Sequence, residues 1–480
     1  MNYVRKVSFH TLGCKLNFSE TSTLARHFAE SGFRRAASSA EADICVVNTC
    51  SVTAASDKKC RNLIRRIHRD NPSAIIAVTG CYAQLRADEL AAIEGVDIVL
   101  GNNEKGDLVQ RVMALAQACV AEAAGKRVAT GPAGKIASRA GLTDLAQARV
   151  VEAAGKVVAL AEKGKAEVHC SPEGELTRFF AAFSGGDRTR AFLKVQDGCD
   201  YRCSYCTIPM ARGASRNASI DEALSQAKLI AAAGQREIVI TGINTGDFGR
   251  TTGETFSDLL RALEGVEGID RYRISSIEPN LLSDEIIGFT TRSTKFMPHF
   301  HVPLQSGADR ILALMRRRYT TAAFASRIAA ARRAMPDAFI GIDVIVGFPG
   351  ETDEDFDATY AFIEGLAPSF VHIFPYSARP NTPAAAMGGH LAPQIVSGRA
   401  AALGELNDRL HRAFCEPFVG RRMEVLMEST RREGRMGGFT PNYLRVEVPY
   451  DRALSGSVVE VELITLNEKG VFEGRLTRPL

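Results

Sequence analysis

Three cysteines lie within eight positions of this chain, in the stretch CDYRCSYC over residues 199–206. Cytosolic proteins rarely keep disulfides, so a tight group of thiols points first to metal binding or redox chemistry. Three thiolates can hold a four-iron cluster and leave one iron open to another ligand, whereas zinc motifs usually pair two C-x2-C units. The spacing of Cys199, Cys203 and Cys206 therefore favours an open iron–sulfur cluster. A zinc site with a distant fourth ligand is the alternative.

Three further cysteines, Cys14, Cys50 and Cys81, each end an apolar run, and these runs are KVSFHTLGC (6–14), ADICVVNTC (42–50) and AIIAVTGC (74–81). The runs predict short strands, and helical stretches lie between them at 19–32 and 56–70. Strand–helix alternation predicts a doubly wound parallel sheet, in which ligands bind outside the carboxyl ends of the strands. We therefore expect the three thiols to converge at one edge of the sheet.

The remaining five cysteines have no motif around them, and we interpret them as structural, which is the usual role of an unpaired cysteine. They are Cys45, Cys60, Cys119, Cys170 and Cys415. The same structural interpretation is the alternative for the three cysteines at the strand ends.

The middle of the chain is rich in Ala, Gly and Lys and contains a duplication. LAQACVAEAAGKRVA (115–129) recurs as LAQARVVEAAGKVVA (145–159) with three differences. Two copies are too few to build a solenoid. We interpret residues 114–184 as an insertion or linker without chemistry of its own.

Six apolar runs with helical stretches between them follow this segment, at 191–196, 237–242, 271–276, 299–304, 339–347 and 370–377. They predict an open, partial (β/α)6 barrel over residues 185–416, with the CDYRCSYC loop after its first strand. Alternating segments such as YLRVEVP and SVVEVELITL predict a small C-terminal β-barrel over residues 417–480. The predicted fold is therefore α/β, with the N-terminal sheet over residues 1–113.

Composition is that of an ordinary globular protein, with 45% hydrophobic residues, 24% charged residues and a net charge of +4. The N-terminus carries no signal-like apolar run, and no apolar stretch approaches the roughly 18 residues of a membrane span. We expect a cytoplasmic protein that does not contact membranes. Four basic clusters favour an RNA partner, although each one alone is usually a solvated face. They are RNLIRRIHR (61–69), MRRRY (315–319), GRRMEV (420–425) and STRREGR (429–435).

Several motifs resemble those of the radical S-adenosylmethionine methylthiotransferase family. They are TLGCKLN (11–17), VVNTCSVT (46–53), VTGCYAQ (78–84), CDYRCSYCTIP (199–209), VPLQSGADRILALMRRRYT (302–320) and GIDVIVGFPGET (341–352). The resemblance covers nearly the whole chain except residues 106–184. TLGCKLN is most similar to the branch that acts on N6-threonylcarbamoyladenosine in tRNA. The family ends in a small RNA-binding β-barrel, the TRAM domain.

The resemblance implies two [4Fe-4S] clusters and S-adenosylmethionine as both methyl donor and radical source. Cys199, Cys203 and Cys206 would hold the cluster that cleaves S-adenosylmethionine, and Cys14, Cys50 and Cys81 the second cluster. Contacts to the cofactor are expected from Tyr205, Gln305, Asp343 and Ile345. Many superfamily members carry Gly-Gly-Glu at the end of the second strand, where this chain has TGIN (241–244), so the contact to the amino group of the cofactor stays unassigned.

The implied reaction installs a methylthio group on C2 of N6-threonylcarbamoyladenosine at position 37 of tRNA, next to the anticodon. The cofactors carry this chemistry, and we nominate no catalytic side chain. The expected partners are this tRNA and a reducing electron donor, and we expect a monomer. Two other substrates stay open, isopentenyl-adenosine in tRNA and an aspartate of a ribosomal protein. The alternative outside enzymes is a zinc-stabilised RNA-binding protein.

Overall fold

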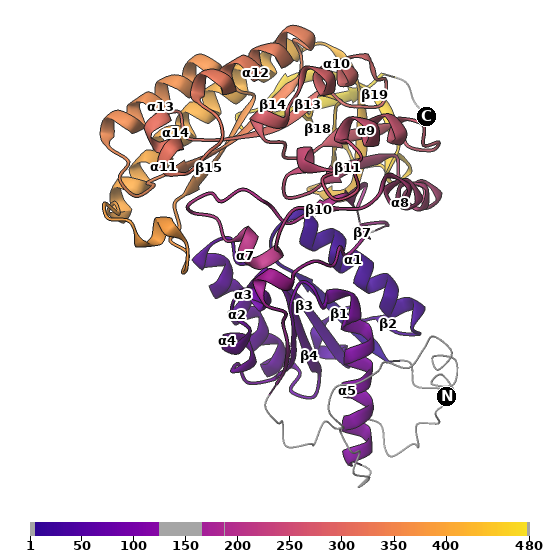
Figure 1. Cartoon of the computed structure of the whole chain (residues 1–480). Helices are drawn as coiled ribbons and strands as arrows, with labels where there is room; N and C mark the ends of the chain where they lie inside the picture. The colour runs from indigo at the N-terminus through magenta and orange to yellow at the C-terminus, as the bar shows by residue number, and fades with distance from the viewer. Residues whose placement is uncertain (1–4, 124–165, 187, 478–480) are drawn as a thin grey trace. The chain divides into compact units, whose positions relative to one another are not determined.

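The computed structural model describes residues 5–123, 166–186 and 188–477 (Figure 1). The chain divides into two compact units. The first comprises Met1–His10, Leu24–Thr49 and Lys58–Cys170, and the second Thr11–Thr23, Cys50–Asp57 and Ser171–Leu480. Most of the duplicated sequence lies outside the described residues. Within the described residues, no helix combines the length and apolarity that crossing a bilayer requires.

The first unit is built on a six-stranded sheet in the order β2-β1-β3-β4-β5-β6. Three strands coincide with the predicted apolar runs, β1 (Lys6–Thr11), β3 (Ile44–Thr49) and β4 (Ile75–Gly80), and β5 (Val96–Leu100) follows them. Strand β3 is buried at every position and pairs in parallel with β4. A parallel strand covered on both faces is expected to be continuously apolar, which is why these runs were readable from sequence. The predicted parallel sheet is confirmed.

Helices connect these strands as the alternation predicts. They are α1 (Lys15–Glu30), α2 (Ala54–Asp70), α3 (Cys81–Leu85), α4 (Ala87–Ala91) and α5 (Leu108–Ala123). Two very short strands, β2 (Arg34–Arg35) and β6 (Glu167–His169), complete the edges, and both pair in parallel with their neighbours. Strand β6 lies inside the segment 114–184, so the described C-terminal part of that segment contributes to the sheet.

The second unit contains the six parallel strands of the predicted partial barrel. They are β8 (Arg190–Lys194), β11 (Glu237–Thr241), β12 (Arg271–Ile274), β13 (His299–Gln305), β14 (Phe339–Val346) and β15 (Phe370–Pro375). Strands β12, β11 and β8 form one parallel sheet, and β13, β14 and β15 form another. A parallel bridge between Ser276 and His301 joins the two sheets. The arc is open, as predicted.

Short strands and helices complete this unit. The strands are β7 (Ala182–Phe183), which is antiparallel to β8, and the antiparallel pair β9 (Gln196–Asp197) and β10 (Arg216–Asn217). The helices are α7 (Ile208–Arg212), α8 (Ile220–Ala232), α9 (Phe256–Glu264), α10 (Asp284–Arg292), α11 (Asp309–Leu314), α12 (Thr321–Ala334), α13 (Asp353–Leu366) and α14 (Pro393–Cys415). Helices α8 and α13 begin with capping boxes, centred on Ser219 and Thr352, which satisfy backbone donors of their first turns.

The two faces of the six-stranded arc differ in chemistry. Alternate side chains such as Leu193, Ile240 and Ile342 lie in the apolar core beneath the helices, and Figure 1 shows α12, α13 and α14 on that side of β13, β14 and β15. The opposite side, here called the polar face, presents the other set of alternate residues. Its polar members are Arg190, Lys194, Glu237, Thr241, Arg271, Arg273, His299, His301, Asp343 and His372. Since parallel strands are ordinarily apolar on both faces, this polar face indicates a functional surface.

The last part of the second unit is a closed five-stranded barrel, which confirms the predicted C-terminal β-barrel. Its strands follow the order β16-β17-β18-β20-β19. They are β16 (Arg422–Arg432), β17 (Arg435–Phe439), β18 (Arg445–Pro449), β19 (Val458–Leu466) and β20 (Val471–Leu476). Alternate residues such as Val446, Val448, Val461 and Leu463 fill its core.

Residues 439–443 of this barrel, the 439–443 loop, contact the amino-terminal ends of strands in the arc. Arg190 donates to the Tyr443 hydroxyl at 3.0 Å, and Arg273 donates to two backbone carbonyls of the loop at 2.7 and 2.8 Å. The ring of His299 lies 4.8 Å from that of Tyr443. The C-terminal barrel therefore supplies hydrogen-bond acceptors to buried cations of the arc.

Replacing Tyr443 with phenylalanine is expected to lower the free energy of unfolding by about 1–2 kcal/mol, because the Arg190 guanidinium loses an acceptor but keeps its ion pair with Glu428. The matched control is Tyr450→Phe, since the Tyr450 hydroxyl makes no hydrogen bond with the described residues. Denaturant unfolding of both variants measures the difference. Equal losses would show that the Arg190–Tyr443 contact does not stabilise the fold.

Candidate functional site

The loop that carries Cys199, Cys203 and Cys206 follows β8 and β9 and ends at α7. Each sulfur accepts a hydrogen bond. Cys199 Sγ lies 3.4 Å from the amide nitrogen of Tyr201, Cys206 Sγ lies 3.4 Å from that of Ile208, and Cys203 Sγ lies 3.0 Å from Arg317 Nη1. The loop is further fixed by a bond from the Cys199 amide to the Gly213 carbonyl. Donors aimed at sulfur suit thiolates that share the negative charge of a metal cluster.

The electrostatics of these thiols are set by burial. Burial raises the pKa of Cys199 and of Cys206 to about 12, and it also raises that of Cys203, against which the Arg317 charge acts. Cys203 also raises the pKa of Cys199, and both raise that of Cys206, as expected for thiols in one loop. Thiols of this kind stay protonated until a bound metal ion replaces the proton. The donor set and its surroundings therefore fit an iron–sulfur cluster.

Two of the four predicted cofactor contacts share one apolar group. The side chains of Tyr205 and Ile345 both pack against the cluster of Ala308, Ile311, Met315, Phe348 and Ala384. The Tyr205 ring meets the Phe348 ring edge-on at 6.5 Å. The structure thus brings Tyr205 beside the GFPG turn after β14, next to the cysteine loop.

The other two predicted contacts lie elsewhere on the arc. Gln305, at the end of β13, has a φ of +69° just after a register shift in the β13–β14 pairing. This left-handed backbone is uncommon for a residue other than glycine, and such strain concentrates at functional sites. Asp343 lies on the polar face, where its Oδ1 is 2.8 Å from His301 Nε2. The cofactor roles of Gln305 and Asp343 stay predictions.

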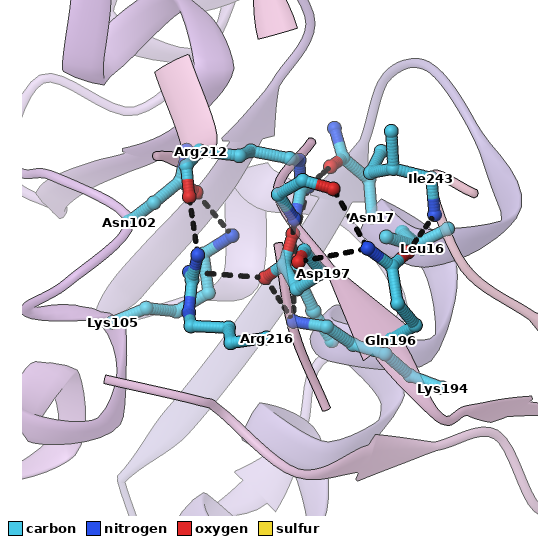
Figure 2. Close-up of polar contacts among 12 residues, drawn as sticks. Leu16, Asn17, Asn102, Lys105, Lys194, Gln196, Asp197, Arg212, Arg216 and Ile243 are labelled. Carbon is cyan, nitrogen blue, oxygen red and sulfur yellow. Dashed lines mark hydrogen bonds and ion pairs between the residues drawn. The ribbon is translucent and has the colours of Figure 1, made fainter. Parts of the chain in front are cut away.

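A buried ionic network supports the cysteine loop (Figure 2). Asp197 Oδ1 accepts hydrogen bonds from Arg212 at 2.9 Å and from the Gly198 amide at 2.8 Å, while Lys194 Nζ lies 2.6 Å from Oδ2. Glu20 of α1 accepts from Lys194 at 2.7 Å and from Arg212 at 2.9 Å. The network therefore ties the first turns of α1, which follow Cys14, to the loop that begins at Cys199.

Charge balance in this network keeps Asp197 ionised. Burial alone would raise the pKa of Asp197, but the charges of Arg212, Lys194 and Arg216 together hold it well below the ordinary value. Figure 2 shows the cationic side chains directed toward this carboxylate. Sequence analysis missed the network because its members are scattered over about 200 positions and form no motif.

Gln196 links the cysteine loop to the end of β11. Its Oε1 accepts from the amides of Ile243 and Asn244, both at 2.9 Å, and its Nε2 donates to the Gly198 carbonyl at 2.8 Å. The side chain of Asn244 is buried, yet its amide makes no hydrogen bond of normal length with the described residues. Asp247, three residues on, is also buried. The segment at the end of β11 thus holds a buried amide and a nearby buried carboxylate, which sequence analysis did not anticipate.

A second polar group, of which the sequence analysis named only Asp343, lies on the strands at the other end of the arc. His301 on β13, Asp343 on β14 and His372 on β15 have ligand atoms that all lie within 4.8 Å of one another. Asp343 and His372 are direct neighbours in the β14–β15 register. Ser276 fixes the other ring nitrogen of His301 at 3.1 Å. The histidines carried no sequence signal because they belong to different strands and form no spaced motif with Asp343.

The three N-terminal cysteines follow the carboxyl ends of neighbouring strands of the sheet. Cys14 comes after β1, Cys50 directly after β3 and Cys81 directly after β4. Gly13 has a φ of +104°, and a Cβ there would lie 2.6 Å from the Cβ of Cys50. Gly80 has a φ of +103°, and a Cβ there would lie 2.4 Å from the backbone oxygen of Thr49. Glycine is required at both positions, because the backbone has a positive φ there and a side chain would overlap with atoms of the neighbouring segment.

Three of the cysteines interpreted as structural, Cys45, Cys60 and Cys415, are buried, and Cys170 is partly buried. Burial raises the pKa of Cys170 and of Cys415 to about 12, so both remain neutral thiols. The side chain of Cys119 lies outside the described residues.

Comparison with known proteins decides the family. Residues 6–101 match the family described as "Uncharacterized protein family UPF0004", and residues 193–363 match the Radical SAM superfamily. The chain is 38% identical over 464 residues to "Threonylcarbamoyladenosine tRNA methylthiotransferase MtaB" of Bacillus subtilis (strain 168), which covers 95% of this chain and 93% of that protein. The chain belongs to the radical S-adenosylmethionine methylthiotransferase family. It is a radical S-adenosylmethionine sulfur transferase, and this excludes the alternative of a zinc-stabilised protein without enzymatic activity.

Other relatives carry a different name. A "tRNA-2-methylthio-N(6)-dimethylallyladenosine synthase" of Thermobifida fusca (strain YX) is 32% identical over 439 residues, which cover 89% of this chain and 78% of that protein. Among solved structures, the radical S-adenosylmethionine methyltransferase TsrM from Kitasatospora setae, with cobalamin and a [4Fe-4S] cluster bound, superposes with a TM-score of 0.54. The superposition covers 80% of this chain and 77% of the TsrM chain, and the two sequences are 15% identical. At this identity the similarity concerns the fold alone. Members of the superfamily use S-adenosylmethionine and a [4Fe-4S] cluster, and the cysteine loop fits that cluster.

Proposed function

We propose that this enzyme transfers a methylthio group to C2 of N6-threonylcarbamoyladenosine at position 37 of tRNA. The observation that carries the proposal is the 38% identity, over 95% of the chain, to a relative named for threonylcarbamoyladenosine. Relatives at 34% and 33% identity over 92% and 98% of the chain carry the same name. The relatives named for dimethylallyladenosine are 30–32% identical to this chain. This identity supports dimethylallyladenosine in tRNA as the second candidate substrate.

Six cysteines would hold two [4Fe-4S] clusters in this proposal. Cys199, Cys203 and Cys206 would bind the cluster at the arc, supported by the hydrogen bonds to all three sulfurs. Cys14, Cys50 and Cys81 would bind the second, supported by their positions after three neighbouring strands. When bound, the clusters and S-adenosylmethionine would supply the radical and the methylthio group. Tyr205, Gln305, Asp343 and Ile345 would contact S-adenosylmethionine.

The protein's own residues would position these groups and exclude water. The Asp197 network and Gln196 fix the cysteine loop against β8 and the end of β11. Asn244 and Asp247 offer a buried amide and a carboxylate to the amino group of S-adenosylmethionine, the contact for which the TGIN sequence provides no Gly-Gly-Glu.

RNA binding would involve the basic clusters that remain exposed. Arg65 and Arg66 of α2 and Arg431 and Arg432 of β16 are exposed, as phosphate contacts require. The MRRRY cluster has another role, since Arg317 is bonded to Cys203 Sγ and to the Glu278 carboxylate. We infer further that the enzyme works as a cytoplasmic monomer and takes electrons from a reducing donor.

Deletion of the gene tests the substrate. We expect tRNA from the deletion strain to lack 2-methylthio-N6-threonylcarbamoyladenosine and to accumulate the unmethylthiolated nucleoside, because the missing enzyme no longer converts that substrate. Mass spectrometry of digested tRNA measures both, and the dimethylallyl nucleosides of the same sample are the internal control. Loss of the methylthio group from dimethylallyladenosine instead would establish the second candidate and contradict the proposal.

A further inference from the structure

Lys15, the first residue of α1, lies on the side of that helix that meets the arc. Residues three apart share one face of a helix, so Lys15 lies beside Phe18. The Phe18 ring contacts the ring of Phe192 edge-on at 5.8 Å. Phe192 stands between Arg190 and Lys194 in β8, on the same side of the strand as the polar face. The first turn of α1 therefore directs Lys15 toward the polar face.

Electrostatic interactions agree with this direction. Desolvation by the surrounding protein lowers the pKa of Lys15, and Tyr443 of the 439–443 loop, Arg190 on β8 and Asp343 on β14 act on its charge. Burial is the largest cause of the lowered pKa values of His299 on β13 and His372 on β15, and the charge of Lys15 lowers both further. Residues on β8, at one end of the arc, and on β13 to β15, at the other, thus interact with the Lys15 ammonium. This is expected if the ammonium lies between the two ends of the arc.

No carboxylate of the described residues forms a direct ion pair with the Lys15 ammonium, although the charge of Asp343 acts on it. The side chain is exposed to solvent, and it makes no hydrogen bond or ion pair with the part of the chain that the structure describes. Other cations of the polar face are paired. Arg190 pairs with Glu428, Arg273 with Glu237 and Lys194 with Glu20. Lys15 is therefore a cation available to an anionic ligand at this face.

A group of possible metal ligands on the polar face also favours an anionic ligand near Lys15. Asp343, one of the groups that interact with Lys15, belongs to the set with His301 and His372 whose ligand atoms lie within 4.8 Å of one another. A fixed ammonium beside these residues repels a metal cation and attracts an anion. Asp343 is hydrogen-bonded to His301 rather than to Lys15.

We propose that Lys15 binds the carboxylate of the threonylcarbamoyl group and so selects this adenosine over adenosines whose N6 substituent is uncharged. The inference rests on the proposed function and identifies the residue that determines its specificity. A dimethylallyl group carries no charge, so an unpaired ammonium at this face would gain nothing from it. A threonyl carboxylate forms a charge-assisted hydrogen bond with the ammonium, which is among the stronger polar contacts available.

The test uses two RNAs and two variants. Anticodon stem-loop RNA is prepared with N6-threonylcarbamoyladenosine or with its methyl ester, which removes the negative charge. For the wild-type enzyme, we expect the ester to lower kcat/KM and RNA binding by about 10- to 100-fold, as loss of a hydrogen bond between charged groups predicts. Lys15→Gln should show a decrease of similar size in kcat/KM and in RNA binding with the RNA that carries the free acid. This variant should no longer distinguish the acid from the ester. Lys15→Arg should restore part of the preference.

Fluorescence anisotropy of the two RNAs with the protein, before any turnover, separates binding from chemistry, and iron content is measured for each variant. The control variant is Lys59→Gln, an exposed lysine of α2, which should keep the wild-type preference for the acid. Equal affinity of the wild type for acid and ester would overturn the inference, as would a Lys15→Gln variant that still prefers the acid. A wild-type enzyme that methylthiolates neither RNA but accepts dimethylallyladenosine would instead contradict the proposed function.

Discussion

Replacing Cys199, Cys203 and Cys206 together with alanine is expected to abolish cleavage of S-adenosylmethionine. The three sulfurs each accept a hydrogen bond in the loop after β8, and this loop lies within residues 193–363, which match the Radical SAM superfamily. Without the thiolates, no ligand for iron remains in the loop, and about four of about eight irons per chain should be lost. Anaerobic reconstitution followed by iron and sulfide assays, and by chromatography of 5′-deoxyadenosine, measures both effects.

The matched variant replaces Cys14, Cys50 and Cys81. It should lose a similar amount of iron, keep forming 5′-deoxyadenosine and make no methylthiolated product, because the proposed second cluster is separate from the first. Cys170→Ala controls for removal of a thiol, since burial keeps Cys170 neutral. If the first variant still cleaves S-adenosylmethionine, or if the second keeps its full iron content, the corresponding assignment is wrong.

The long strands were predictable from sequence because each is buried on at least one face. Strand β14 was expected at 339–347 and is found at Phe339–Val346, and β3 lies within the apolar run at 42–50. Strands β2 and β6, of two and three residues, were not predicted. Segments so short show no periodicity, and their pairing depends on neighbouring strands rather than on their own composition.

The candidate site was predictable only where chemistry imposes a spacing. Cys199, Cys203 and Cys206 lie in one loop, so their pattern is visible in the sequence. Lys15, Asp197 and the histidines of the polar face are brought together by strand order and by helix packing, over separations that no local motif records. The TLGCKLN motif contained Lys15, but only its position beside Phe18, against β8, gives that lysine a role.

Replacing Asp197 with alanine is expected to destabilise the second unit by about 3–5 kcal/mol, because it leaves three buried cations with one carboxylate. Lys194 and Arg212 would keep their ion pairs with Glu20, whereas Arg216 would lose the one it makes with Asp197; the side chains of all four are at most 8% exposed. The Gly198 amide would also lose its acceptor, directly before Cys199. We therefore expect lower iron content as well as a lower free energy of unfolding. Denaturant unfolding of the apo protein and iron assay after reconstitution measure the two effects.

The matched control is Glu364→Ala, which removes an exposed ion pair with Arg409 and should cost about 1 kcal/mol or less. Acidification gives an independent check. Because the pKa of Asp197 is lowered in the folded state, its contribution is complete above the ordinary aspartate value and is lost as the pH falls below about 4. The stability difference between wild type and Asp197→Ala should therefore shrink in acid. If, at neutral pH, Asp197→Ala lowers the free energy of unfolding by no more than Glu364→Ala does, the network does not stabilise the cysteine loop.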